Sequence, residues 1–260
     1  MPDFDRWPAG NFCWIDLSTT DLEGASSFYG PLFGWQYNDI PMGPEAVYRM
    51  PQIRARDIAG MSELQPEQRA QGVPPHWLSY VSVADADATS AKIGAAGGVV
   101  VMPPFDVMDV GRMAIAQDPT GAMFALWQPR SHPGYRVAAE HGTICWTELA
   151  TPDPTKAAGF YTEVFGWTPQ AWEGAMPYTM FQNEGQSTCG MFQLTAEMAG
   201  VPPHWMPYFA VEDCDASAAL AQQLGGALLM PPTDIPDIGR FATVRDPQGA
   251  VFSLIKLAGM

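Results

Sequence analysis

The sequence predicts an α+β protein built from four βαβββ modules, because it repeats itself at two levels. At the first level half of the chain is duplicated: residues 72–77 (GVPPHW) return unchanged at 200–205, and 33–35 (FGW) return at 165–167. At the second level, each half contains a strand, a helix and three strands, followed by the same series again. Such repetition indicates that one small structural unit occurs four times.

The first module shows each kind of element in turn. Residues 12–17 are a short β-compatible run, and the apolar residues of 25–33 have the spacing of an amphipathic helix that ends at Gly34. Thr20 and Glu23 have capping-box spacing, which predicts Thr20 as the N-cap of this helix. Three short strands are then expected over 35–38, 47–51 and 57–62.

The second module repeats this order. We expect a strand over 77–83, a helix over 85–96, and strands near Val99, Met113 and Met123. In the second half of the chain, Asp153 can cap a helix whose first position is Pro154, where proline is favoured.

The duplication divides the chain into a first domain over 1–128, a linker over 129–140 and a second domain over 141–260. The first domain has 15 acidic and 7 basic residues, and the rest of the chain has 13 and 6, for a net charge of −15. Because nucleic acids and anionic membranes select clustered Lys and Arg, this charge argues against both as partners. A small molecule is the expected partner, bound by a monomer or homodimer.

The composition also indicates a compartment. No apolar run approaches the about 18 residues of a membrane-spanning helix, and residues 1–6 do not begin a signal peptide. The cysteines form no CxxC pair and are expected to be reduced and buried; they are Cys13, Cys145, Cys189 and Cys214. We therefore expect a cytoplasmic protein.

Two motifs carry a resemblance to a known family. The opening strand leads to a helix with Phe-Tyr-x-x-x-Phe-Gly-Trp, and the closing strands contain Gly-Arg and then Asp-Pro-x-Gly, at 118–121 and 246–249. With them the chain resembles the vicinal oxygen chelate superfamily of glyoxalase I, bleomycin-resistance proteins and extradiol dioxygenases. More closely, it is similar to two-domain actinobacterial glyoxalase-like proteins, including a mycobacterial antigen. The resemblance implies two cupped sheets, with helices outside and ligand sites inside.

The resemblance also locates the family's metal ligands, a His on the first strand of a module and a Glu near the end of its last. The matching histidine positions are Trp14, Leu78, Trp146 and Met206, and the glutamate positions are Ala125 and Ser253. Indole, alkyl and thioether groups cannot replace imidazole and carboxylate as ligands of Mg²⁺, Fe²⁺ or Zn²⁺. The comparison therefore implies no metal and no other cofactor.

Strand alternation identifies the other residues of each cup, because residues i and i+2 point the same way. In the first cup the expected ligand-binding residues are Trp14, Asp16, His76, Leu78, Tyr80, Met123, Ala125 and Trp127. In the second cup they are Trp146, Glu148, His204, Met206, Tyr208 and Ser253. Aromatic and thioether walls with a few polar groups suit a flat or apolar organic molecule.

The polar residues also have structural interpretations. Asp16 and Glu148 can hydrogen-bond the backbone or pair with an arginine, and His76 and His204, which follow Pro-Pro, can fix a loop. A relocated metal site of Asp16 with His76, or of Glu148 with His204, would have two ligands, fewer than tight sites use.

Three functions stay open. The first is a metal-free protein that binds a small apolar or aromatic molecule in one or both cups, in a sequestering, resistance-like or carrier role. The second is an enzyme, either a lyase, isomerase or cyclase with Asp16, His76, Glu148 and His204 as acid–base candidates, or a metal-dependent glyoxalase or oxygenase. The third is a scaffold or regulatory protein with vestigial cups.

Overall fold

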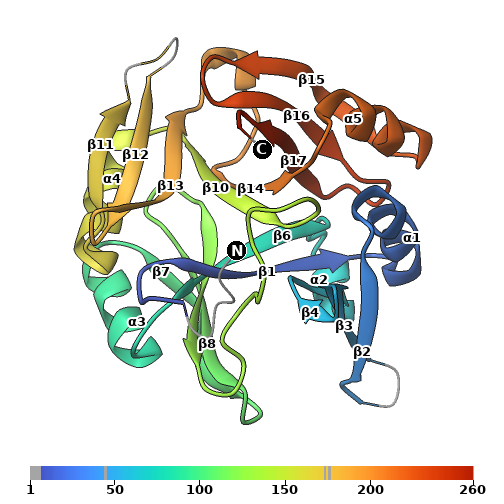
Figure 1. Cartoon of the computed structure of the whole chain (residues 1–260). Coiled ribbons are helices and arrows are strands. Elements are labelled where there is room, and N and C mark those ends of the chain that lie inside the picture. Colours follow the sequence, from blue (N-terminus) through green and yellow to red (C-terminus); the bar gives the residue numbers. More distant parts are fainter. Residues whose placement is uncertain (1–6, 44–45, 173, 175–176, 260) are drawn as a thin grey trace.

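The computed structural model describes residues 7–43, 46–172, 174 and 177–259, and it contains two mixed β-sheets with helices at the boundary between them (Figure 1). The elements of the first half are β1 (Phe12–Thr19), α1 (Leu22–Phe33), β2 (Gln36–Pro41), β3 (Val47–Ile53), β4 (Arg56–Asp57), β5 (Gly60–Glu63), α2 (Pro66–Ala70), β6 (His76–Ser82), α3 (Ala86–Ala95), β7 (Val99–Val107), β8 (Gly111–Gln117) and β9 (Met123–Pro129). Those of the second half are β10 (Ile144–Thr151), α4 (Pro154–Phe165), β11 (Thr168–Trp172), β12 (Tyr178–Asn183), β13 (Gln186–Gln193), the 3₁₀ helix η1 (Ala196–Met198), β14 (His204–Ala210), α5 (Cys214–Gln223), β15 (Ala227–Ile235), β16 (Gly239–Arg245) and β17 (Val251–Leu257).

Each sheet joins two modules side by side. The strand orders are β2-β3-β5-β1-β6-β9-β8-β7, with β4 paired to β3, and β11-β12-β13-β10-β14-β17-β16-β15. The first strands of the two modules are antiparallel neighbours in both sheets, β1 with β6 and β10 with β14. Four βαβββ modules paired in this way confirm the predicted α+β fold, while the boundaries at residues 128 and 141 stay a prediction.

The helices of the first and third modules begin at aspartates. The side chains of Asp21 and Asp153 each accept a hydrogen bond from the backbone N–H three residues further on, and Pro154 follows Asp153 as predicted. The prediction that Thr20 caps α1 was wrong by one residue, because the Asp21 carboxylate is the acceptor at the positive end of this helix. Helix α1 ends as predicted at Gly34, whose φ is 72°.

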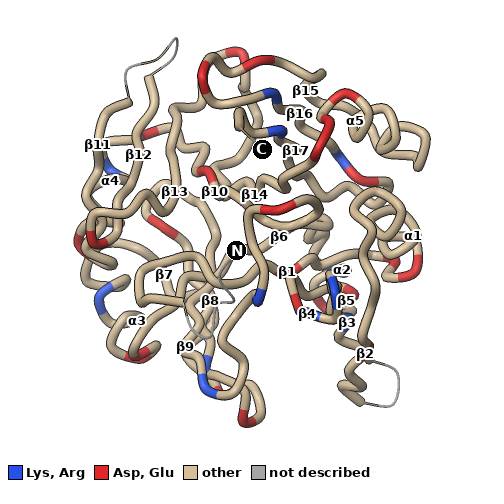
Figure 2. Tube along the Cα trace, viewed as in Figure 1, with Lys and Arg blue, Asp and Glu red and all other residues tan. Residues whose placement is uncertain are grey.

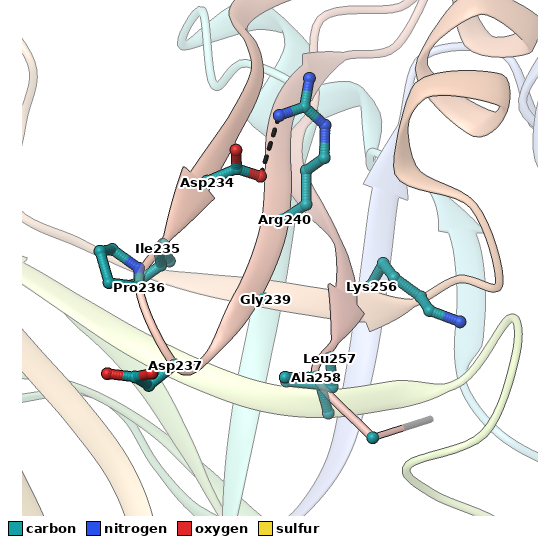
Figure 3. A pocket seen from close by; sticks show the side chains of 10 residues that line it. Asp234, Ile235, Pro236, Asp237, Gly239, Arg240, Lys256, Leu257 and Ala258 are labelled. Carbon is teal, nitrogen blue, oxygen red and sulfur yellow. Dashed lines mark hydrogen bonds and ion pairs between the residues drawn. The ribbon is translucent and has the colours of Figure 1, made fainter.

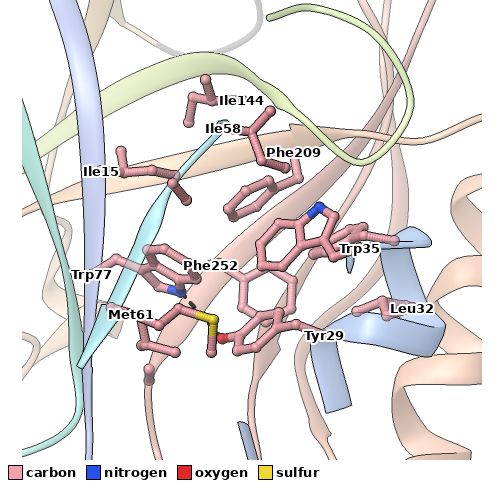
Figure 4. Close-up of a cluster of buried hydrophobic side chains, with 14 of the residues drawn as sticks. Ile15, Tyr29, Leu32, Trp35, Ile58, Met61, Trp77, Ile144, Phe209 and Phe252 are labelled. Carbon is pink, nitrogen blue, oxygen red and sulfur yellow. Dashed lines mark hydrogen bonds between the residues drawn. The ribbon is translucent and has the colours of Figure 1, made fainter. Parts of the chain in front are cut away.

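The two halves share their hydrophobic cores. One cluster of buried residues joins α1 and β1 to β14, β16, β17 and α5, and the other joins β6, β8, β9 and α3 to α4 and β13. In Figure 4, Tyr29 and Trp35 of the first half lie against Phe252 and Phe209 of the second. Each half therefore completes the core of the other.

Reciprocal hydrogen bonds connect the helices of one half to the turns of the other. The Tyr29 hydroxyl on α1 donates to Asp246 Oδ2, and the Tyr161 hydroxyl on α4 donates to Asp118 Oδ2, both at 2.9 Å. Oδ1 of each aspartate accepts backbone N–H groups of its own Asp-Pro-x-Gly turn. The two repeated motifs of the sequence, Phe-Tyr and Asp-Pro-x-Gly, thus meet across the boundary between the halves.

The tryptophans that follow these helices make a second reciprocal pair of contacts. The Trp35 indole N–H donates to the carbonyl oxygen of Gly142, and the Trp167 indole N–H donates to that of Gly10, both at 2.7 Å. Such an exchange of equivalent contacts is the pattern of a two-fold interface.

The sheets meet through their helix-side faces, so the two cups open in opposite directions. Trp77 of β6 and Phe209 of β14 lie together in a shared core, with ring centroids 5.4 Å apart. Residues next to them in the chain point to the other side of each sheet, which is the cup side.

Acidic residues are spread over both halves (Figure 2). Among the described residues, no helix is long and apolar enough to cross a membrane.

Candidate functional site

Four side chains form one hydrogen-bonded group on the floor of the first cup. The Trp14 indole N–H donates to Asp16 Oδ1 at 2.8 Å and to the Tyr48 hydroxyl at 2.9 Å. The Tyr48 hydroxyl donates to Asp16 Oδ1 and the Tyr80 hydroxyl donates to Asp16 Oδ2, both at 2.7 Å. Both carboxylate oxygens of Asp16 therefore have donors.

The register of the strands places this group. Trp14 and Asp16 are two residues apart on β1, and Tyr80 lies opposite Trp14 on β6, so all three share one face. Gly60 on β5 lies beside Asp16. A Cβ at Gly60 would collide with the Tyr48 hydroxyl and the Asp16 carboxylate. The missing side chain at Gly60 is what lets Tyr48 reach the carboxylate.

The second cup repeats this group with one changed contact. Tyr208 lies opposite Trp146, and a Cβ at Gly190 would collide with the Tyr178 hydroxyl. The Tyr208 hydroxyl donates to Glu148 Oε2 at 2.7 Å. The Trp146 indole N–H donates to the Tyr178 hydroxyl at 2.9 Å and not to the carboxylate. Glu148 therefore receives fewer hydrogen bonds than Asp16.

Burial raises the pKa of both cup carboxyl groups. For Asp16 burial has the largest effect, and hydrogen bonds from its three aromatic donors oppose it by stabilising the carboxylate. For Glu148 burial again has the largest effect on the pKa, opposed by the hydroxyls of Tyr208 and Tyr178. Each cup thus holds a carboxyl group that keeps its proton to a higher pH than an exposed one.

The predicted histidines make loop contacts at the entrances of β6 and β14. Nδ1 of His76 lies 2.9 Å from the carbonyl oxygen of Pro74, and Nδ1 of His204 lies 2.8 Å from that of Pro202. Within the described part of the chain, neither ring is hydrogen-bonded to a carboxylate. Burial lowers the pKa of His204. The structure therefore does not bring the carboxylate and the histidine of either cup into a hydrogen-bonded acid–base pair.

The other residues predicted to line the cups lie on the flanking strands. Ser253 lies beside Tyr208, and its hydroxyl is 3.1 Å from the hydroxyl of Thr243. The buried members of the set are Leu78, Ala125, Trp127 and Ser253, and the partly exposed members are Met123 and Met206.

Two central residues, Tyr48 and Tyr178, are missing from the predicted set. The duplication carries a signal for both, because Tyr48 and Met50 recur as Tyr178 and Met180 at one offset. Since alternate residues of a strand share a face, the repeated Tyr-x-Met pattern places each tyrosine and its methionine on the same side of the sheet.

The linker covers the first cup. The His132 ring packs edge-on against the Trp14 indole with centroids 4.5 Å apart, and the Tyr135 ring stacks on the same indole at 6.5 Å. The Trp127 indole N–H donates to the carbonyl oxygen of His132 at 2.9 Å. The Tyr135 hydroxyl donates to the carbonyl oxygen of Phe12 at 2.9 Å. A segment predicted only to connect the domains is thus part of the first cup.

We expect acid to weaken the packing of His132. Burial lowers its pKa to about 4, below the ordinary value of about 6.5. Between these values the unfolded chain binds the proton first, so stability falls as the pH falls. Chemical unfolding at pH 7 and pH 4.5 should show the wild type losing about 1–2 kcal/mol more than His132→Gln, which does not titrate. Equal losses in the two proteins would contradict a buried, neutral ring.

A surface depression of about 410 Å³ lies at the ends of β15, β16 and β17 (Figure 3). It is lined by Lys256 and by Arg240, whose guanidinium forms ion pairs with Asp234 at 2.9 Å and Asp215 at 2.7 Å. Another depression, of about 280 Å³, is lined by 7–9 and 82–84. None of the residues predicted to bind a ligand lines either depression.

The fold and the paired cups define a class of protein. The model of the Glyoxalase/Bleomycin resistance protein/Dioxygenase superfamily matches residues 12–126 and 143–254. The chain belongs to this superfamily, as its motifs predicted.

Particular relatives match the whole chain. It is 42% identical over 261 residues to "Putative glyoxylase CFP32" of Mycobacterium bovis, a match that covers 99% of both chains. It is 34% identical to the anthracycline biosynthesis protein DnrV of Streptomyces peucetius, over 97% of this chain and 95% of the other. The Mn(II)-bound glyoxalase from Novosphingobium aromaticivorans is 14% identical with a TM-score of 0.66, over 95% of this chain and 82% of the other, and shares its fold.

Proposed function

We propose that the protein binds a small, largely apolar or aromatic molecule in its cups without a metal ion, in a sequestering, resistance-like or carrier role. The observation that carries the proposal is the group of one indole, two phenols and one carboxylate on each cup floor. In the second cup Trp146 and Met206 are partly exposed, and their surfaces suit a flat ring. The name of the anthracycline biosynthesis relatives is compatible with a polycyclic aromatic ligand.

The donors in the cups do not fit a metal ion. The indole N–H groups of Trp14 and Trp146 donate to acceptors, and an indole offers a metal no lone pair. Each cup-floor group contains one carboxylate, and the histidine predicted as its co-ligand is hydrogen-bonded to a proline carbonyl. In the described part of the chain, no three His, Cys, Asp or Glu side chains are grouped as metal ligands. Tight zinc and iron sites use three or four such donors.

We expect planar aromatic compounds to quench the tryptophan fluorescence saturably, and Trp146→Ala to weaken binding at least about tenfold by removing a ring contact. Met108, which is 60% exposed between β7 and β8 of the other sheet, provides the control, because Met108→Ala should leave the affinity unchanged. Metal analysis of protein purified without chelator should find less than one transition metal per chain. Flat titrations over a broad aromatic library, or stoichiometric Mn, Fe, Ni or Zn, would contradict the proposal.

The raised pKa of the Glu148 carboxyl group supports an enzyme as the second candidate. A desolvated carboxyl beside the Tyr208 hydroxyl can serve as a general acid in lyase, isomerase or cyclase chemistry. Turnover of a bound aromatic compound that survives EDTA and is lost in Glu148→Gln would favour this candidate. Binding without turnover favours the sequestering or carrier role.

A further inference from the structure

The carboxylates of the two cups differ in how fully they are hydrogen-bonded. Asp16 accepts three hydrogen bonds, two at Oδ1 and one at Oδ2. Glu148 accepts the Tyr208 hydroxyl at Oε2. The Tyr178 hydroxyl is its second donor, and this hydroxyl also accepts the indole N–H of Trp146. Glu148 therefore lacks the third donor, the indole N–H, that Asp16 has.

The cups also differ in access. Trp14 is 3% exposed because His132 and Tyr135 of the linker pack on it, whereas its counterpart Trp146 is partly exposed. Two further pairs of equivalent residues show the same contrast. Leu78 and Met50 of the first cup are buried, whereas their counterparts in the second cup, Met206 and Met180, are partly exposed.

These two differences have opposite consequences for ligand binding. In the first cup both carboxylate oxygens of Asp16 are hydrogen-bonded and the Trp14 indole is covered. This group is therefore complete as a structural element without a ligand. In the second cup the Glu148 carboxylate has no indole donor and its side chain is partly exposed, so a donor on a ligand can take that place. A neutral O–H donor suits this position, since an acidic ligand would be repelled by the carboxylate.

We propose that the second cup is the ligand site, and that its ligand is a planar aromatic phenol. The ring packs on Trp146 between the thioethers of Met180 and Met206, and the hydroxyl donates to the Glu148 carboxylate. This assignment rests on the proposed function and specifies the cup, the ligand class and the recognising group.

The test compares 2-naphthol with 2-methoxynaphthalene, which has the same rings but no donor, by isothermal titration calorimetry on the full chain. The wild type should bind 2-naphthol at one site per chain, about 10–100-fold more tightly than the methyl ether. Glu148→Met should abolish this preference. Glu148→Gln, which preserves the shape of the side chain, should reduce it several-fold. Asp16→Asn, the matched change in the first cup, should leave it intact.

Each result discriminates. A preference that disappears in Asp16→Asn and persists in both Glu148 variants would assign the ligand to the first cup and overturn this inference, while the proposed function would stand. Two equal sites per chain, or equal affinity of the wild type for the two compounds, would overturn it in the same way. Absence of binding to the wild type by any planar aromatic compound would overturn both.

Discussion

Replacing Trp167 with alanine is expected to lower the free energy of unfolding by about 3–5 kcal/mol and to destabilise both halves of the chain together. Trp167 is fully buried and stacks on Tyr161, with ring centroids 5.4 Å apart. Its indole N–H donates to the carbonyl oxygen of Gly10 in the other half. The substitution therefore leaves a cavity and an unpaired carbonyl at the boundary between the halves, where both share the loss.

Urea unfolding followed by circular dichroism and by tryptophan fluorescence measures this effect. We expect the two signals to coincide in one transition at a lower urea concentration than in the wild type. Trp172, which is 48% exposed, provides the matched control, and Trp172→Ala should change the stability by less than about 0.5 kcal/mol. Two separate transitions, with only the second half weakened, would contradict the shared core.

Replacing Asp118 with alanine is expected to cost about 3 kcal/mol or more, because several buried donors lose one acceptor at once. Asp118 is 3% exposed. Its Oδ1 accepts the backbone N–H groups of the Asp-Pro-x-Gly turn, from Thr120, Gly121 and Ala122. Its Oδ2 accepts the Tyr161 hydroxyl from the other half. The variant thus loosens the turn and its contact with α4 together.

Two milder variants separate these contributions in the same unfolding assay. Tyr161→Phe removes only the hydroxyl and should cost about 1 kcal/mol. Asp118→Asn keeps one oxygen for the turn and should lie between the other two. If Asp118→Ala were no more destabilising than Tyr161→Phe, the carboxylate would not be holding the turn.

Most of the fold could be predicted because it is local and repeated. Alternation, helical spacing and Gly34 identify strands and helices within one module, and the duplication extends them to all four. What could not be predicted is how the halves dock. The hydrogen bond between Tyr29 and Asp246 joins positions 217 residues apart. Local spacing does not predict which residue of the other half will accept this hydrogen bond.

The candidate site shows the same division. Trp14, Asp16 and Tyr80 could be grouped in advance, because they lie on strands whose facing side follows from alternation. The covering of Trp14 by His132 could not, since it depends on the path of a linker without regular structure. The histidines after Pro-Pro had two interpretations, a loop-fixing hydrogen bond or a contact with a ligand. His76 and His204 lie within hydrogen-bond distance of proline carbonyl oxygens, which is the contact that the loop-fixing interpretation expects.

The reciprocal contacts between the halves have a consequence for the history of the chain. Two separate copies of one half, related by a two-fold axis, would make the same paired contacts as a homodimer. In a homodimer every substitution appears in both binding sites, so the sites stay identical. Once the two copies are joined in one polypeptide, each can change alone. The fully hydrogen-bonded Asp16 under its covering linker, and the longer Glu148 with fewer donors, are differences that a homodimer could not hold and a fused chain can.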